Sequence, residues 1–79
     1  MPTDPTSVRW TLHALDKTQQ LGFTRRDVES ALLEGHRERR RNKGQARWMV
    51  ASGRLVIAYE YPDGEDLLVA RIVTVWRRR

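Results

Sequence analysis

The chain has 79 residues, which is room for one small domain and too little for a deep pocket around a large cofactor. Fifteen lysines and arginines against ten aspartates and glutamates give a net charge of +5, which favours a polyanionic partner. The chain contains no cysteine, which excludes disulfides, thiolate zinc sites and thiol nucleophiles and predicts a reducing, cytoplasmic location. The longest apolar run is far shorter than the roughly 20 residues that cross a bilayer, so no membrane partner is expected.

The N-terminus is predicted to be a flexible leader over residues 1–7, because Pro2 and Pro5 lie there among small polar residues. Residues 8–79 are predicted to form a single domain.

Two helices are predicted in the first half of this domain. Thr11 can cap a helix over residues 12–21, which glycine ends at the next position. The second helix is predicted to run from Thr24, which forms a short capping box with the aspartate three residues later, to Gly35. Each helix carries an apolar stripe that must pack on a partner surface.

Three strands are predicted in the second half, where the apolar period changes from about 3.6 to 2. They cover about residues 46–51, 54–61 and 67–77. Ser52-Gly53 is the predicted two-residue loop of the first hairpin, and Pro62-Asp63-Gly64-Glu65 is the predicted turn of the second.

This loop would place Ala51 opposite Arg54 and so decide which side chains share a face of the sheet. The predicted core face carries Trp48, Val50, Leu55, Ile57, Tyr59 and Tyr61, continued by Leu68, Ala70, Ile72 and Trp76. The opposite face carries Arg47, Met49, Arg54, Val56, Ala58 and Glu60, joined by Arg71 and Arg77. The predicted fold is therefore α+β, with two N-terminal helices packed on one face of a three- or four-stranded antiparallel sheet. Val8 to Trp10 is the candidate fourth, edge strand.

The segment 36–47 is the most basic part of the chain, with six cations and one acid. It is either a solvated loop that complements the end of the second helix or, with the C-terminal arginines, a surface that contacts nucleic-acid phosphates. The predicted nucleic-acid-binding residues are Arg37, Arg39, Arg40, Arg41, Lys43, Arg54, Arg77, Arg78 and Arg79. No aromatic residue interrupts the basic segment, so it would supply affinity without reading bases.

Other polar residues allow a plain reading beside a functional one. His13 lies in the first helical turn, where it is either a surface residue or a neutral imidazole that accepts a proton, since the positive end of a helix disfavours the charged ring. Asp63, Glu65 and Asp66 are read as hairpin-tip residues, and the three tryptophans as packing residues. Neither a metal nor a cofactor is expected.

One family resemblance adds to this reading. The run His13-Ala14-Leu15-Asp16-Lys17 and the closing run Ile72-Val73-Thr74-Val75-Trp76-Arg77 resemble the opening and the final strand of a small bacterial His-Ala-Leu domain family of unassigned function. That family is grouped with RelE-like toxins and with the barnase, EndoU and colicin type of ribonuclease fold. Thr18 and Leu21 stand where the family usually has methionine and arginine.

The resemblance implies a RelE-like fold and active-site roles for His13 and Thr74, with Arg47 and Arg71 beside them. A shared site for Thr74 and Arg71 conflicts with the predicted strand parity, which places Thr74 on the core side and Arg71 on the opposite side. A bulge that shifts the strand would remove the conflict.

The predicted function is a toxin-like, metal-independent endoribonuclease that cleaves RNA, free or on the ribosome, through attack of the 2′-OH. The alternative is a non-catalytic module that binds nucleic acid or pairs with a small acidic antitoxin or immunity protein.

Overall fold

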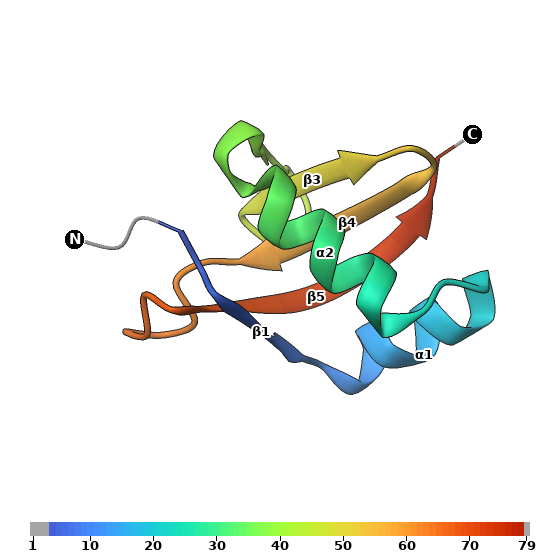
Figure 1. The fold of residues 1–79 in the computed structure, drawn as a ribbon, viewed down its shortest axis with the longest axis horizontal. Coiled ribbons are helices and arrows are strands. Elements are labelled where there is room, and N and C mark those ends of the chain that lie inside the picture. Colours follow the sequence, from blue (N-terminus) through green and yellow to red (C-terminus); the bar gives the residue numbers. More distant parts are fainter. Residues whose placement is uncertain (1–3, 79) are drawn as a thin grey trace.

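The computed structural model describes residues 4–78 and contains two α-helices and a five-stranded sheet (Figure 1). In chain order the elements are β1 (Ser7–Trp10), α1 (Leu12–Leu21), α2 (Arg25–Gly35), the 3₁₀ helix η1 (His36–Glu38), β2 (Arg40–Arg41), β3 (Trp48–Ser52), β4 (Leu55–Glu60) and β5 (Val69–Arg77). The α+β class is therefore confirmed. Among these residues, no helix is long and apolar enough to cross a membrane.

The sheet has the strand order β1-β5-β4-β3-β2 and is mixed, which corrects the predicted three or four antiparallel strands. The candidate edge strand does form, but it pairs in parallel with β5, because the chain passes through both helices and the other strands before it returns beside β1. The short β2, which the sequence pattern did not indicate, adds to the other edge beside β3.

Ordered structure begins before the predicted boundary at residue 8. Ser7 already belongs to β1, Pro5 is buried, and Asp4 accepts a 2.9 Å hydrogen bond from Nε of Arg37. Of the predicted leader, residues 1–3 lie outside the described residues.

Both predicted helices form with the predicted caps. Thr11 accepts a hydrogen bond from the amide of Ala14, and Gly22 ends α1 in the left-handed conformation at φ 81°. Thr24 and Asp27 form a reciprocal capping box at the start of α2. Side-chain caps of this kind satisfy amides that the helix itself leaves unpaired.

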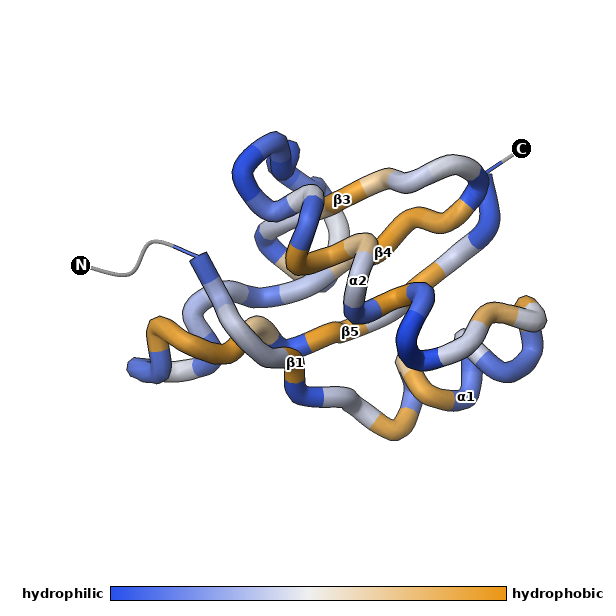
Figure 2. The backbone as a smooth tube through the Cα atoms, in the orientation of Figure 1, coloured by the Kyte–Doolittle hydropathy of each residue, from blue (hydrophilic) through white to orange (hydrophobic). Residues whose placement is uncertain are grey.

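The core lies between the helices and one face of the sheet, whose central strands β4 and β5 are the most apolar part of the chain (Figure 2). Most strand residues predicted for this face are buried there: Val50, Leu55, Ile57, Tyr59, Tyr61, Ala70 and Ile72. Trp48 is half-buried, and Leu68, which comes just before β5, is 47% exposed. α2 lies across this face, while α1 flanks the C-terminal half of β5 beyond the end of β1 (Figure 1).

The first hairpin turns at Gly53-Arg54, not at the predicted Ser52-Gly53. Ser52 pairs with Leu55, and Gly53 has φ 59°. Glycine at the first turn position, followed by a residue with negative φ, suits a type II′ turn. The register moves by two residues, so every β3 and β4 side chain keeps its predicted face.

The last strand departs from the prediction at a bulge. Tyr59 pairs with Ile72 and Ala58 with Thr74, so Val73 is the extra residue. Beyond it the alternation of faces reverses. Val75 lies in the core, whereas Thr74 and Trp76 move to the face away from α2 and Arg77 moves to the helix side; the predicted faces of Trp76 and Arg77 are therefore wrong.

Candidate active site and nucleic-acid interface

The face of the sheet away from α2, which we call the open face, carries three rows of side chains that run across the strands. The ionic row consists of Arg9, Arg71, Glu60 and Arg47. The middle row consists of Thr74, Ala58, Met49 and Arg40. The aromatic row consists of Trp76, Val56 and Ala51.

Thr11 joins the start of α1 to the bulge in β5. Besides capping the helix, its hydroxyl lies 2.9 Å from the carbonyl oxygen of Ile72 and 3.2 Å from that of Val73. The first helical turn is therefore anchored at the point where β5 changes parity. Two residues after Thr11 on the helix is His13, and one residue after the bulge is Thr74.

His13 and Thr74, to which the resemblance gives active-site roles, meet at this junction. Nε2 of His13 lies 3.0 Å from Oγ1 of Thr74, at an exposed position at the end of the middle row. A threonine hydroxyl both donates and accepts, so it can orient the imidazole in either tautomer. The bulge resolves the conflict of parity, because it brings Thr74 to the face that carries Arg71.

The ionic row supplies cations on the same face of the sheet as Thr74. Arg71 lies opposite Glu60, and the backbone amide of Arg47 donates a 2.9 Å hydrogen bond to Oε2 of Glu60. Nε of Arg47 lies 3.8 Å from the other oxygen of the same carboxylate. Glu60 and Ala58 are two residues apart on β4, so the ionic and middle rows are separated by about 7 Å. An arginine side chain spans that distance.

One aspartate links the other end of the ionic row. Asp63 lies 3.5 Å from Nη1 of Arg9 and 3.7 Å from Nε of Arg71. Both arginine side chains are exposed, at 71% and 45%, so each ion pair is worth at most about 1 kcal/mol and can exchange for another anion. Arg9 and Asp63 were missed as site residues; the signal for Arg9 was the alternation along the candidate strand 8–10.

The open face is less basic than predicted. Val56 and Ala58 lie on it and are nevertheless buried, with 3% and 1% of their surface exposed. Their cross-strand neighbours are Trp76, Thr74, Met49 and Ala51, which cover them. An apolar strip thus separates the ionic row from the basic residues at the far end of the sheet, and Trp76 presents a half-exposed ring beside the His13 and Thr74 pair.

Part of the predicted basic surface is occupied within the fold. Arg39 stacks 4.3 Å from the ring centre of Trp48 and donates to the carbonyl of His36, and Arg41 lies 5.5 Å from the same ring. Arg77 donates a 2.7 Å hydrogen bond to the carbonyl of Leu21 and lies 5.5 Å from the ring of Phe23. These contacts fix the guanidinium groups in place on the helix side.

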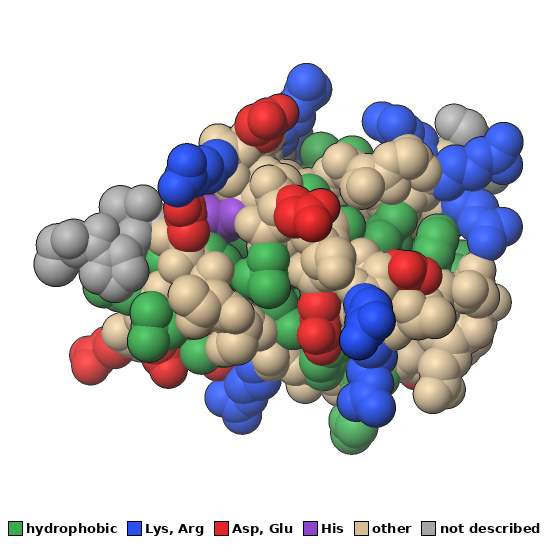
Figure 3. All heavy atoms as spheres, in the orientation of Figure 1, with side chains coloured by type: hydrophobic (Ala, Val, Ile, Leu, Met, Phe, Trp, Pro, Cys, Tyr) green, Lys and Arg blue, Asp and Glu red, His purple; other side chains and the backbone are tan. Residues whose placement is uncertain are grey.

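The remaining predicted cations are exposed. Arg40, Lys43, Arg54 and Arg78 lie at the edge and far end of the sheet, where Arg78 donates to the carbonyl of Gly53. Arg37 is exposed beside Asp4, and Arg79 lies outside the described residues. On the helix side, acidic and basic side chains are interspersed, and a group of basic ones gathers near the C-terminus (Figure 3).

The second histidine belongs to the core. His36 is fully buried, its Nδ1 lies 2.7 Å from the hydroxyl of Tyr59, and its ring meets Tyr61 edge-on. Burial raises the pKa of the Tyr59 hydroxyl, and the positive charge of Arg39 lowers it by a smaller amount. His36 is thus the C-cap residue of α2, and its buried ring belongs to the core rather than to a phosphate-binding surface.

Within residues 4–78 no three histidine, aspartate or glutamate side chains come together as metal ligands do. The chain matches no family model, no curated protein and no solved structure.

Proposed function

We propose that this protein is a toxin-like, RelE-like endoribonuclease that cleaves RNA through attack of a 2′-OH on the neighbouring phosphate, without a metal ion. The observation that carries the proposal is the 3.0 Å contact between His13 and Thr74, with Arg71 one row away on the same face.

The reaction forms a bond between the 2′ oxygen and phosphorus and breaks the bond between phosphorus and the 5′ oxygen. The nucleophile belongs to the RNA, so the protein must provide proton transfer and stabilise charge on the phosphate. His13 takes the proton of the 2′-OH and returns it to the leaving 5′ oxygen. Thr74 positions the imidazole, and Arg71 and Arg47 neutralise the developing negative charge.

The arginines of the ionic row reach the phosphate by exchanging partners. Arg71 leaves Asp63 and Arg47 leaves Glu60 when a phosphate dianion-like transition state replaces the carboxylate. Because these pairs are exposed and long, the exchange costs little. The exposed Arg40, Arg54 and Arg78 would bind the phosphates of flanking nucleotides.

The alternative is a non-catalytic binding function, and the ion pairs of the ionic row favour it. If Asp63 and Glu60 keep their arginines, the open face is a binding surface only, for nucleic acid or for a small acidic partner such as an antitoxin or immunity protein.

The test is cleavage of a mixed RNA pool in excess chelator by the native chain, by His13→Ala and by Gln19→Ala. Gln19 is exposed on the same helix and serves as the matched control. Loss of a proton-transfer group lowers the rate by on the order of 10² to 10⁴, so His13→Ala should be nearly inactive and Gln19→Ala normal. Equal cleavage by the two folded variants would retire His13. Absence of cleavage by the native chain, on free RNA and on translating ribosomes, would favour the binding function.

A further inference from the structure

The outer edge of β3 is only partly covered. β2 pairs only with Trp48 and Met49, and the chain just before β2 forms η1 instead of a longer strand. Among the described residues, no strand lies beside Val50, Ala51 and Ser52 on this side.

The backbone of Ala51 points to this open position. In an antiparallel sheet, the amide and carbonyl of successive residues point to alternate sides. Asn42 donates to the carbonyl of Arg47 across the β2 hairpin, so the odd-numbered residues of β3 face outwards. Met49 meets Arg40 there, while the amide and carbonyl of Ala51 face a position that no strand occupies.

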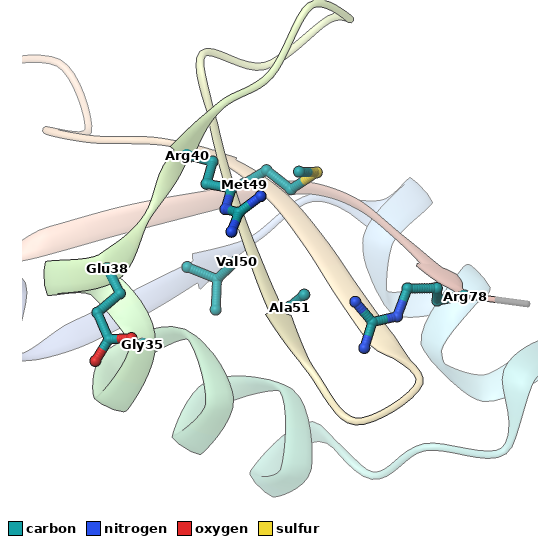
Figure 4. A pocket seen from close by; sticks show the side chains of 7 residues that line it. All are labelled: Gly35, Glu38, Arg40, Met49, Val50, Ala51 and Arg78. Atoms are coloured by element: carbon teal, nitrogen blue, oxygen red, sulfur yellow. The ribbon is translucent and has the colours of Figure 1, made fainter.

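A hollow of about 380 Å³ lies beside this edge. It is lined by Gly35, Glu38, Arg40, Met49, Val50, Ala51 and Arg78. Figure 4 shows Arg40 and Arg78 on the two sides of Ala51, with their guanidinium groups turned towards the space between them. Gly35 forms the wall at the end of α2, and it must be glycine, because a Cβ atom there would lie 2.6 Å from Cγ1 of Val50.

We propose that this edge binds an extended acidic peptide segment of another protein, which adds to the sheet as a strand beside Val50 to Ser52. The backbone of Ala51 would exchange one donor and one acceptor with the peptide backbone, and carboxylates of the peptide would pair with Arg40 and Arg78. Glu38 is the one acidic side chain among the lining residues, so the hollow as a whole favours a negatively charged strand.

Two other occupants fit less well. An RNA strand could use the two guanidinium groups and the amide, but its backbone has no amide that would pair with the carbonyl of Ala51 as a neighbouring β-strand does. A second copy of this chain would complete the backbone pairing, but it would bring four guanidinium groups together at one junction. The edge lies at the end of the middle and aromatic rows away from His13, so the peptide would leave the proposed cleavage site open and would compete with RNA only for Arg40 and Arg78.

The test uses the ¹⁵N-labelled full chain and a capped seven-residue peptide that alternates valine and glutamate, with lysine in place of glutamate in the control peptide. The acidic peptide should shift the amide resonances of β3 and slow hydrogen exchange at Ala51, and the basic peptide should bind at least tenfold more weakly.

Ala51→Pro should lower the affinity for the acidic peptide about tenfold or more, because proline removes the outward amide. Proline is tolerated on an edge strand where its nitrogen faces solvent, and Ala51→Thr, which keeps the amide, is the matched control. Should Ala51→Pro not fold, the pair Arg40→Gln and Arg78→Gln should weaken binding by a similar factor.

Three outcomes would overturn the proposal. Binding could be absent or unchanged in both sets of variants. Single-stranded RNA could shift the β3 resonances where the peptide does not, which would make the edge a nucleic-acid surface. Sedimentation could show a dimer of the native chain that Ala51→Pro dissociates, which would make the occupant a second copy.

Discussion

The imidazole of His13 depends on few neighbours for its orientation. It is exposed, and its contact on the open face is the hydroxyl of Thr74 at 3.0 Å. A single hydrogen bond of this kind contributes about 1 kcal/mol. In the proposed reaction, His13 transfers the proton and Thr74 positions the imidazole.

Replacement of Thr74 should separate these two roles. Thr74→Val removes the hydroxyl and keeps the shape, so we expect RNA cleavage to fall about tenfold, much less than on loss of His13. Thr74→Ser keeps the hydroxyl and should remain near the native rate. Single-turnover cleavage rates measure both; a larger loss for serine than for valine would show that the methyl group matters rather than the hydrogen bond.

The buried tyrosine beside His36 predicts a loss of stability at high pH. Burial raises the pKa of Tyr59 above its ordinary value of 10.0, so the unfolded chain releases the phenolic proton first. The contribution of Tyr59 is thus complete below pH 10 and is lost as the pH rises above it. The free energy of unfolding should fall by at most about 1.4 kcal/mol per pH unit from this group. Urea titrations from pH 9 to 11 check this, and Tyr59→Phe, although less stable at neutral pH, should show a shallower fall; parallel curves would contradict it.

At the scale of elements, the bulge at Val73 determines what the open face presents. It places Thr74 beside His13 and turns the ring of Trp76 away from the core, two residues further along β5. A half-exposed aromatic residue next to the proposed cleavage site is a surface on which a base can stack.

Trp76 should therefore contribute to RNA affinity. Stacking of one base is worth about 1 to 3 kcal/mol, so Trp76→Ala should weaken single-stranded RNA binding by about 5- to 150-fold. Trp76→Phe should retain most of the affinity. Fluorescence anisotropy with a labelled oligonucleotide and the inactive His13→Ala background measures this, and equal affinity for alanine and phenylalanine would show that the ring packs on Val56 and does nothing more.

The Thr11 cap links the stability of α1 to the site. Thr11→Ala should destabilise the fold by about 1 kcal/mol, because the amide of Ala14 loses its acceptor. It should also reduce RNA cleavage, since the first turn loses its two hydroxyl contacts to the bulge. Thr11→Ser should restore both. Thermal unfolding and cleavage rates measured together would contradict the link if stability fell and activity did not change.

Signals from residues close together in the sequence were enough to predict both helices and most strand faces. The caps at Thr11 and Thr24, Gly22 after α1 and Gly35 at the end of α2 are properties of a few neighbouring residues, so the sequence pattern places both helices correctly. The predicted faces of the β3 and β4 side chains are correct even though the turn lies one residue later. The pairing register moves by two residues, and such a shift leaves each side chain on the same face of the sheet. The bulge could not be predicted from alternation, since Val73, Thr74 and Val75 read equally well in either parity. The parallel pairing of β1 depends on contacts more than 60 residues apart in sequence, such as Ser7 with Val69, for which no local signal exists.

At the scale of the whole molecule, the positive charge is spread unevenly. Arg39, Arg41 and Arg77 are held on the helix side by aromatic rings and carbonyls, whereas Arg54 and Arg78 remain exposed at one end of the sheet and Arg40 at its β2 edge. RNA should thus cross the open face from the ionic row towards this end.

Binding should weaken steeply with salt. If four phosphates are neutralised, the affinity for single-stranded RNA should fall about 50-fold on a fourfold increase in salt. Arg54→Gln should lower this slope, and Arg39→Gln should lower stability more than the slope. Titrations at two salt concentrations separate these effects; a salt-independent affinity would remove RNA from the partners of this protein.

The most direct measurement of the central claim compares two oligonucleotides of one sequence, one of RNA and one with 2′-deoxyribose throughout, incubated with the native chain in excess chelator. We predict cleavage of the RNA alone, with a 2′,3′-cyclic phosphate on one product and a 5′-hydroxyl on the other, identified by mass spectrometry. Cleavage of the 2′-deoxy oligonucleotide, or RNA products with a 5′-phosphate, would contradict the account, because the RNA would then not supply the nucleophile.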